Sequence, residues 1–184
     1  MVFPLSLAFN ASAEAATLKD FPNFRFFTTK RAVAGTPQFD VPSNGSCDSP
    51  VCNRWVTADE ATKDDSAYLR SFSAACFMTV RDIAKMRKSQ VAMALVQSAW
   101  GGTRVEAWMS SQAIERAGPD FSKHVPPGAD QNAASALYNA MVAPWDPFSV
   151  RAMLWCEPRG RTCSRHLTAP HAPSRPQVPG GGKR

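Results

Sequence analysis

The feature that most constrains this chain is a short apolar run that ends in a glycine turn. Val91–Val96 (VAMALV) is continuously apolar, which is typical of a strand covered on both faces in a parallel sheet. The chain then turns at Gly101-Gly102. Before this run, apolar residues recur at three- and four-residue steps over Asp64–Met86, which predicts one long helix. A helix followed by a buried strand predicts an α/β fold.

Weaker patterns predict the other elements. They are a helix over Phe3–Ala16, a strand over Asn23–Thr29, a long loop over Gly35–Asn53 anchored by Trp55, a helix over Ala133–Met141 that stops before Pro144, and a strand over Val150–Trp155. Thr103 and Glu106 have the spacing of a helix capping box, so Glu106 is predicted to be a structural cap.

Charge divides the chain into two parts. The net charge is +6, and most of it lies in residues 156–184, which hold six basic residues and one acid, no aromatic residue and five prolines. Such a segment buries too little apolar surface to offset its ordering entropy. We therefore expect a folded domain over residues 1–155 and a disordered basic tail over residues 156–184. Polyanion binding through this tail would be non-specific phosphate attraction.

The five cysteines leave one pairing open. Cys47 and Cys52 bracket a four-residue loop in which a local disulfide is sterically possible. The pairing stays open for a secreted protein and is disfavoured for a cytosolic one. No second cysteine pair has zinc-ligand spacing and His124 stands alone, so neither a metal nor another cofactor is expected. Cys76 falls on the apolar side of the predicted helix, as a small buried hydrophobe.

The glycine turn has two interpretations. A strand that ends in Gly-Gly and leads into a helix delivers backbone amides to the carboxyl edge of a parallel sheet, as an oxyanion hole requires. Gly101 and Gly102 are the candidates for that role. The alternative is a tight turn in which the glycines serve packing alone.

The segment Ala94–Trp108 (ALVQSAWGGTRVEAW) resembles the sialate O-acetylesterase family, whose signature is Ser-x-Trp-Gly-Gly-Thr-x-x-Glu-x-Trp. Leu137–Pro144 (LYNAMVAP) is similar to a second family segment, and the resemblance extends over about residues 1–155. It implies a three-layer α/β/α sandwich with a parallel sheet, of the SGNH hydrolase type. It also implies a serine esterase that removes O-acetyl groups from sugars. The candidate residues for its substrate pocket are Ser98, Trp100, Thr103 and Asn139.

The same resemblance predicts an incomplete site. The family's nucleophile lies in a Gly-Gln-Ser-Asn-Met motif, and Met1 matches only the methionine of that motif. The family's Asp-x-x-His motif has no counterpart in this sequence. Trp155-Cys156-Glu157 stands where the family has Trp-Tyr-Gln-Gly-Glu. His166 and His171 lie in the tail and do not replace the base merely by being histidines. We therefore expect a truncated esterase domain without a catalytic triad, which is inactive in this form.

Two alternatives remain open: a sugar-binding module without catalysis, and an interaction protein that uses its basic tail. The expected partner is an O-acetylated sugar, with no specific nucleic acid and no membrane span. Oligomeric state and localisation stay open. The N-terminal apolar run Val2–Phe9 does not have the pattern of a signal peptide, although the resemblance is compatible with a secreted or lysosomal parent.

Overall fold

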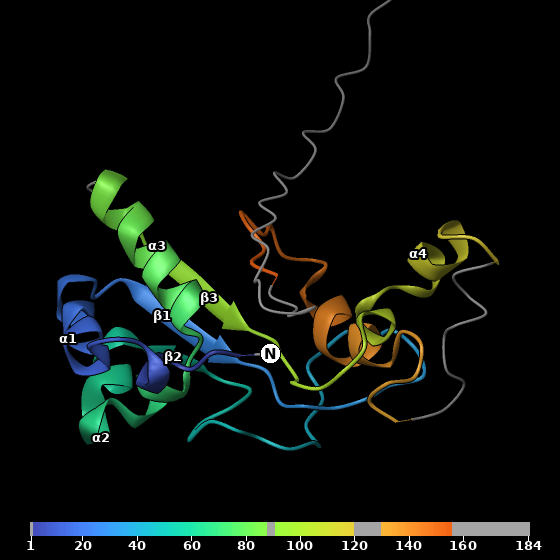
Figure 1. The fold of residues 1–184 in the computed structure, drawn as a ribbon, viewed down its shortest axis with the longest axis horizontal. Helices are drawn as coiled ribbons and strands as arrows, with labels where there is room; N and C mark the ends of the chain where they lie inside the picture. The colour runs from blue at the N-terminus through green and yellow to red at the C-terminus, as the bar shows by residue number, and fades with distance from the viewer. Residues whose placement is uncertain (1, 88–90, 120–129, 156–184) are drawn as a thin grey trace, which may run out of the picture.

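The core of the fold is a three-stranded mixed sheet in the order β2-β1-β3. This computed structural model describes residues 2–87, 91–119 and 130–155. Strand β1 (Phe24–Thr28) pairs antiparallel with β2 (Trp55–Thr57) and parallel with β3 (Met93–Gln97) (Figure 1). The strands predicted around β1 and β3 are confirmed, with small shifts of their ends. The short antiparallel strand β2 was not predicted.

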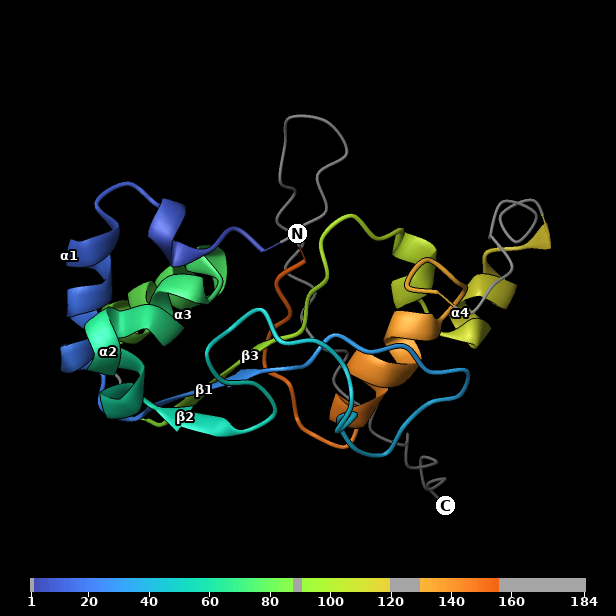
Figure 2. The same ribbon diagram turned by 90° about the horizontal axis from the view of Figure 1, so that it is seen from below.

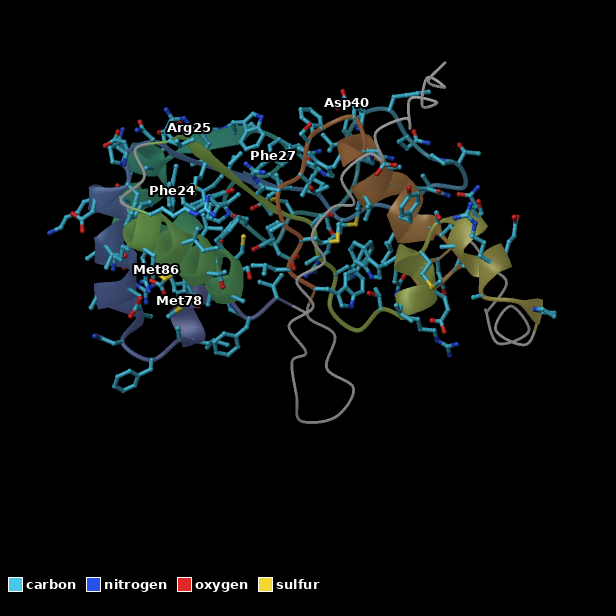
Figure 3. All side chains as sticks on the ribbon, turned by 90° about the horizontal axis from the view of Figure 1, so that it is seen from above. Phe24, Arg25, Phe27, Asp40, Met78 and Met86 are labelled. Atoms are coloured by element: carbon cyan, nitrogen blue, oxygen red, sulfur yellow. A yellow bond between two sulfur atoms is a disulfide. The ribbon has the colours of Figure 1, made fainter. Side chains whose placement is uncertain are left out.

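Helices pack on one face of this sheet. They are η1 (Leu5–Leu7), α1 (Ala11–Ala16), η2 (Thr17–Asp20), α2 (Ala58–Ser71) and α3 (Ala74–Arg87), with α1, α2 and α3 together on one side in Figure 2. Phe24 and Phe26 of β1 point into the core between sheet and helices, where both are almost completely buried. Figure 3 shows Phe24 on the side of α3, with Arg25 and Phe27 at the opposite side. The α/β class predicted from the sequence is confirmed.

The single helix predicted over Asp64–Met86 is wrong, because the chain breaks between α2 and α3. Phe72 is extended (φ −74°, ψ 156°) and only 1% exposed. The Ser73 amide donates to Gln97 Oε1 at 2.6 Å, and the Ser73 hydroxyl accepts from the Cys76 amide at 3.3 Å. The serine thus ends one helix and caps the next, while the apolar spacing continues across the break.

The helix predicted over Phe3–Ala16 is also interrupted. Ala8, at the end of η1, is extended, and Asn10 before α1 has a left-handed backbone (φ 56°). The Leu5 amide donates to the Phe72 carbonyl at 2.9 Å. Contacts to the α2–α3 junction therefore replace the helical hydrogen bonds expected in this segment.

Helix α2 begins with a capping box that sequence inspection missed. The Thr57 hydroxyl accepts from the Glu60 amide at 3.1 Å, and Glu60 Oε2 accepts from the Thr57 amide at 2.9 Å. The hydrogen bond from the Thr57 amide is the main reason why the pKa of the Glu60 carboxyl is lowered, and a hydrogen bond from Arg54 lowers it further. Thr57 is also the last residue of β2, so the box joins the sheet to α2.

Replacing Thr57 with alanine should lower the free energy of unfolding by about 1 kcal/mol, because the Glu60 amide in the first turn loses the hydroxyl that accepts its hydrogen bond. Thr62→Ala, the same change within α2, is the matched control and should be close to neutral. Urea unfolding of both variants measures the difference. Equal effects of the two substitutions would contradict the importance of the cap.

A second group of short helices follows β3. It comprises η3 (Val105–Trp108), α4 (Ser111–Arg116), the π-helical turn η4 (Tyr138–Val142) and η5 (Ala143–Trp145). A small apolar cluster holds η3 and η4 together, with Trp100 and Trp108 packed against it; its buried members are Ala32, Ala107, Leu137, Ala140 and Met141. Figure 1 places these helices beyond the ends of β1 and β3, on the opposite side of the molecule from α1.

Of three predictions for this second group, one is confirmed in part and two are wrong. The helix expected over Ala133–Met141 forms as η4, which ends before Pro144, and η5 follows directly with the proline in its first turn, where it is tolerated. The capping box of Thr103 and Glu106 does not form, since η3 is a single 3-10 turn that begins after Arg104 without a side-chain cap. Val150–Trp155 forms no strand in the described part of the chain, because it pairs with no strand edge; Val150 is 49% exposed.

Among the described residues, two cysteines form a disulfide and one is a free thiol. Cys47 and Cys52 form the disulfide that the sequence left open, within the predicted loop. Cys76 is a free thiol that packs against the core, and burial raises its pKa to about 12. Trp55, the expected anchor of the loop, begins β2 and lies with its ring centroid 5.2 Å from that of Phe27. His124 and the predicted tail, residues 156–184, lie outside the described residues.

Candidate functional site

A cavity of about 360 Å³ opens at the carboxyl ends of β1 and β3. This is the edge at which open α/β sheets bind ligands. Its lining comes from the N-terminal segment, the ends of both strands, the disulfide loop, the end of α2 and the glycine turn: Val2, Pro4, Ser6, Thr28, Thr29, Arg31, Asp48, Ser71, Gln97, Ala99 and Gly101. Hydroxyl and amide groups predominate among the polar members of this set.

The end of β1 places two threonines in the cavity. The Thr28 hydroxyl lies 3.0 Å from the Tyr68 hydroxyl, and burial raises the pKa of that phenol. The Thr29 amide donates to the Gln97 carbonyl at 2.9 Å, which extends the pairing of β1 with β3. The Thr29 hydroxyl is buried and has no hydrogen-bond partner among the described residues. A buried hydroxyl without a partner is costly, and this one belongs to a residue of the cavity lining.

An ion pair lies at the rim of the cavity. The Arg31 guanidinium pairs with the Asp48 carboxylate and lies over the Trp100 ring, 5.8 Å from its centroid. Two backbone hydrogen bonds join Arg31 to Ser46, at 2.8 and 3.1 Å. Gly45 makes this close approach possible: its φ is +116°, and a Cβ there would lie 2.3 Å from the Arg31 carbonyl oxygen.

The glycine turn reaches the same cavity. Gly101 lines the cavity, and Gly102 has the left-handed φ of +77° that closes the turn. The Thr103 hydroxyl donates to the Trp100 carbonyl at 2.7 Å and accepts from Trp108 Nε1 at 2.9 Å. No described residue accepts a hydrogen bond from the Gly101 or Gly102 amide. The turn is thus held by side chains, while these two amides keep their capacity to donate.

The other candidate residues hold the turn in place and lie outside the cavity lining. The Ser98 hydroxyl donates to the Met141 carbonyl at 2.7 Å, which ties the turn to η4. Asn139 is buried and donates from Nδ2 to the Ala34 carbonyl at 3.1 Å. Trp100 packs against the small apolar cluster under the Arg31 guanidinium. Of the named candidates, the structure brings only Gly101 into the lining.

Sequence reasoning missed the threonines of β1 and the ion pair. Thr28 is the last residue of β1 and Thr29 follows it, so the rule that ligands bind at the carboxyl ends of strands was the available signal. Arg31 and Asp48 carried no such signal, because a loop brings them together. Within the described residues, no group of three or more metal-ligating side chains comes together, and no helix is long and apolar enough to cross a membrane.

No family model matches the chain. The chain is 29% identical to the sialate O-acetylesterase of Pongo abelii over 90 residues and 28% identical to that of Homo sapiens over 90 residues. Each match spans 48% of this chain and 17% of the relative. The resemblance to sialate O-acetylesterases is confirmed.

The fold has a solved counterpart. The structure of a carbohydrate acetylesterase from Xanthomonas citri superposes with a TM-score of 0.62 over 86% of this chain and 30% of that protein, at 23% sequence identity. At this identity the match shows the fold alone, which is an α/β fold. The matched region thus covers 17% of the length of the two sialate O-acetylesterases and 30% of that of the carbohydrate acetylesterase.

Proposed function

We propose that residues 1–155 form the substrate-binding and oxyanion side of a sialate O-acetylesterase-like domain, which takes an O-acetylated sugar into the cavity at the ends of β1 and β3. The observation that carries this proposal is the meeting of Gly101 and Thr29 in one cavity. The glycine turn provides amide donors for an oxyanion, and the lining around Thr29 is rich in hydroxyl and amide groups, which suit a sugar. The names and fold of the relatives support the substrate class.

We further propose that the 184-residue polypeptide does not hydrolyse acetyl esters by itself. Its sequence contains no Gly-Gln-Ser-Asn word and no Asp-x-x-His word. Without the nucleophile no acyl-enzyme forms, and without the histidine no base takes the proton of the nucleophile. Loss of one triad member costs roughly 10⁴-fold in rate in serine hydrolases. Ser98 does not replace the nucleophile, because its hydroxyl donates to the Met141 carbonyl.

Two measurements on the full chain test these proposals. Hydrolysis of 4-nitrophenyl acetate and of an O-acetylated sialic acid should proceed at the background rate, with and without a serine-directed fluorophosphonate. Turnover that the fluorophosphonate abolishes would refute the proposed inactivity. Saturation-transfer NMR should detect binding of O-acetylated sugar, and binding should weaken in Gly101→Val, which adds a branched side chain at a residue of the cavity lining. Undiminished binding in this variant would place the sugar elsewhere.

A further inference from the structure

Two of the six asparagines lie in acceptor sequences for N-glycosylation, Asn10-Ala11-Ser12 and Asn44-Gly45-Ser46. Such triplets also occur by chance, so the sequence alone does not assign a modification. The structure adds what an attached glycan requires, because the asparagine and the serine of both triplets are exposed. A bulky polar chain on either asparagine would extend into solvent and displace no part of the fold.

The two asparagines of these triplets also differ from others in their hydrogen bonds. Asn53, Asn132 and Asn139 bond through their side chains to backbone groups, at 2.6 to 3.1 Å. Among the residues that the structure describes, none forms a hydrogen bond with the side chain of Asn10 or Asn44. The Nδ2 atoms of these two side chains can therefore carry a glycan without the loss of a contact that holds the fold.

The second triplet lies in the same loop as the disulfide. Ser46 directly precedes Cys47, whose bond to Cys52 closes this loop. Disulfides of this kind form in the oxidising lumen of the secretory pathway, which is also the compartment in which N-glycans are attached. The Ser46 backbone pairs with that of Arg31 at 2.8 and 3.1 Å, so the triplet is held at the surface of the domain.

An apolar pair lies next to the first triplet. Leu7 and Phe9 are 67% and 96% exposed, while Ala8 between them packs against the core. The backbone at Ala8 is extended (φ −72°, ψ 150°), which directs the side chains of its two neighbours away from the core. Large apolar side chains that lie together in solvent favour association between chains unless something covers them. Asn10 directly follows Phe9, so a glycan on Asn10 begins beside this pair.

We propose that Asn10 and Asn44 carry N-linked glycans, and that the glycan on Asn10 covers the apolar pair Leu7 and Phe9. The co-substrate is a lipid-linked oligosaccharide pyrophosphate. Its transfer forms a bond between the asparagine Nδ2 and C1 of the first N-acetylglucosamine, and breaks the bond between that C1 and a pyrophosphate oxygen. Nδ2 loses one proton, and the lipid pyrophosphate leaves. The proposal does not depend on the esterase site, because neither asparagine lines the cavity.

Mass spectrometry of the full chain from its natural source tests the two sites. PNGase F in heavy-oxygen water removes each glycan and converts its asparagine into a labelled aspartate. Trypsin then yields one peptide that ends at Lys19 and one that ends at Arg54, and label is expected at Asn10 and Asn44. Asn53 lies in the second peptide outside any acceptor triplet, so it is the internal control. Absence of label at both sites would overturn the proposal, and absence at one would overturn that site.

Variants of Ser12 test whether the glycan covers the apolar pair. The full chain, secreted from a eukaryotic host behind a cleavable signal peptide, should lose one glycan in Ser12→Ala and keep it in Ser12→Thr. Ser12→Ala should then bind more anilinonaphthalene sulfonate, a dye for apolar surface. This difference should vanish when Phe9→Ser is added to both variants. It should persist when Phe39→Ser is added, because Phe39 is equally exposed, at 99%, but lies in another loop.

The outcomes decide the cover separately from the sites. Equal dye binding by Ser12→Ala and Ser12→Thr would overturn the cover, as would a difference that persists after Phe9→Ser. If Ser12→Ala is not secreted, the folded Asn44→Gln variant is compared before and after treatment with PNGase F, which then removes the Asn10 glycan alone. A rise in dye binding on this treatment supports the cover, and unchanged binding contradicts it.

Discussion

Replacing Phe26 with alanine is expected to lower the free energy of unfolding by about 3 to 5 kcal/mol, a large part of the stability of a typical small domain. The Phe26 ring is fully buried in the middle strand of the sheet. Its centroid lies 5.3 Å from that of Phe72 and 6.4 Å from that of Phe77, at the ends of α2 and α3 that meet there. Alanine would leave a cavity at the point where sheet and helices join.

The loss should extend to the candidate site, because Phe26 lies two residues before Thr28 and three before Thr29 on the same backbone. Urea unfolding followed by tryptophan fluorescence measures the stability. Phe39→Ala is the matched control: Phe39 is 99% exposed, and the change should alter stability by no more than about 0.5 kcal/mol. Similar losses in both variants would mean that β1 is not the centre of the core.

Sequence reasoning predicted the parts of the fold that local patterns specify. β1 and β3 were found because Phe24–Thr28 and Met93–Gln97 belong to apolar, β-forming runs. The break between α2 and α3 was missed because Phe72 continues the apolar spacing. The contacts found at the break, between Phe72 and Phe26 and between Ser73 and Gln97, join segments that are far apart in the sequence. β2 has three residues, too few for a period-two pattern, and it forms by pairing with β1.

The candidate site was predictable only in part for a similar reason. The glycine turn is contiguous in sequence, so its residues identify it. The cavity instead joins segments that are far apart, such as Thr29, Asp48 and Gly101, and depends on the disulfide loop. Ser98 and Asn139 bear polar groups near the turn, but both groups already donate hydrogen bonds to backbone carbonyls. Ser98 donates to η4, and Asn139 donates to the loop after β1. Such partners are set by tertiary packing and carry no signal in the sequence.

Arg81 provides a test of how helices α1 and α3 are joined. Its side chain is 7% exposed and pairs with Glu14 of α1 and, at 2.9 Å, with its neighbour Asp82. Burial alone would lower the pKa of Arg81, but hydrogen bonds to Asp82 and Glu14 raise it, so the guanidinium stays charged. Its face also lies 5.7 Å from the Phe77 centroid. α1 and α3 are therefore linked through a charge that is largely removed from water.

Arg81→Met should lower the free energy of unfolding by about 2 to 3 kcal/mol, because the change leaves Glu14 without its partner in a site that is 25% exposed. The expected loss is below that of a fully buried pair, since Glu14 retains some contact with water. Adding Glu14→Gln to Arg81→Met should recover part of the loss, as a double-mutant cycle by urea unfolding would show. Arg70→Met is the matched control: its partner Asp65 is 92% exposed, so this pair should contribute little. Additive effects of the two changes at positions 14 and 81 would show that the ion pair does not couple α1 to α3.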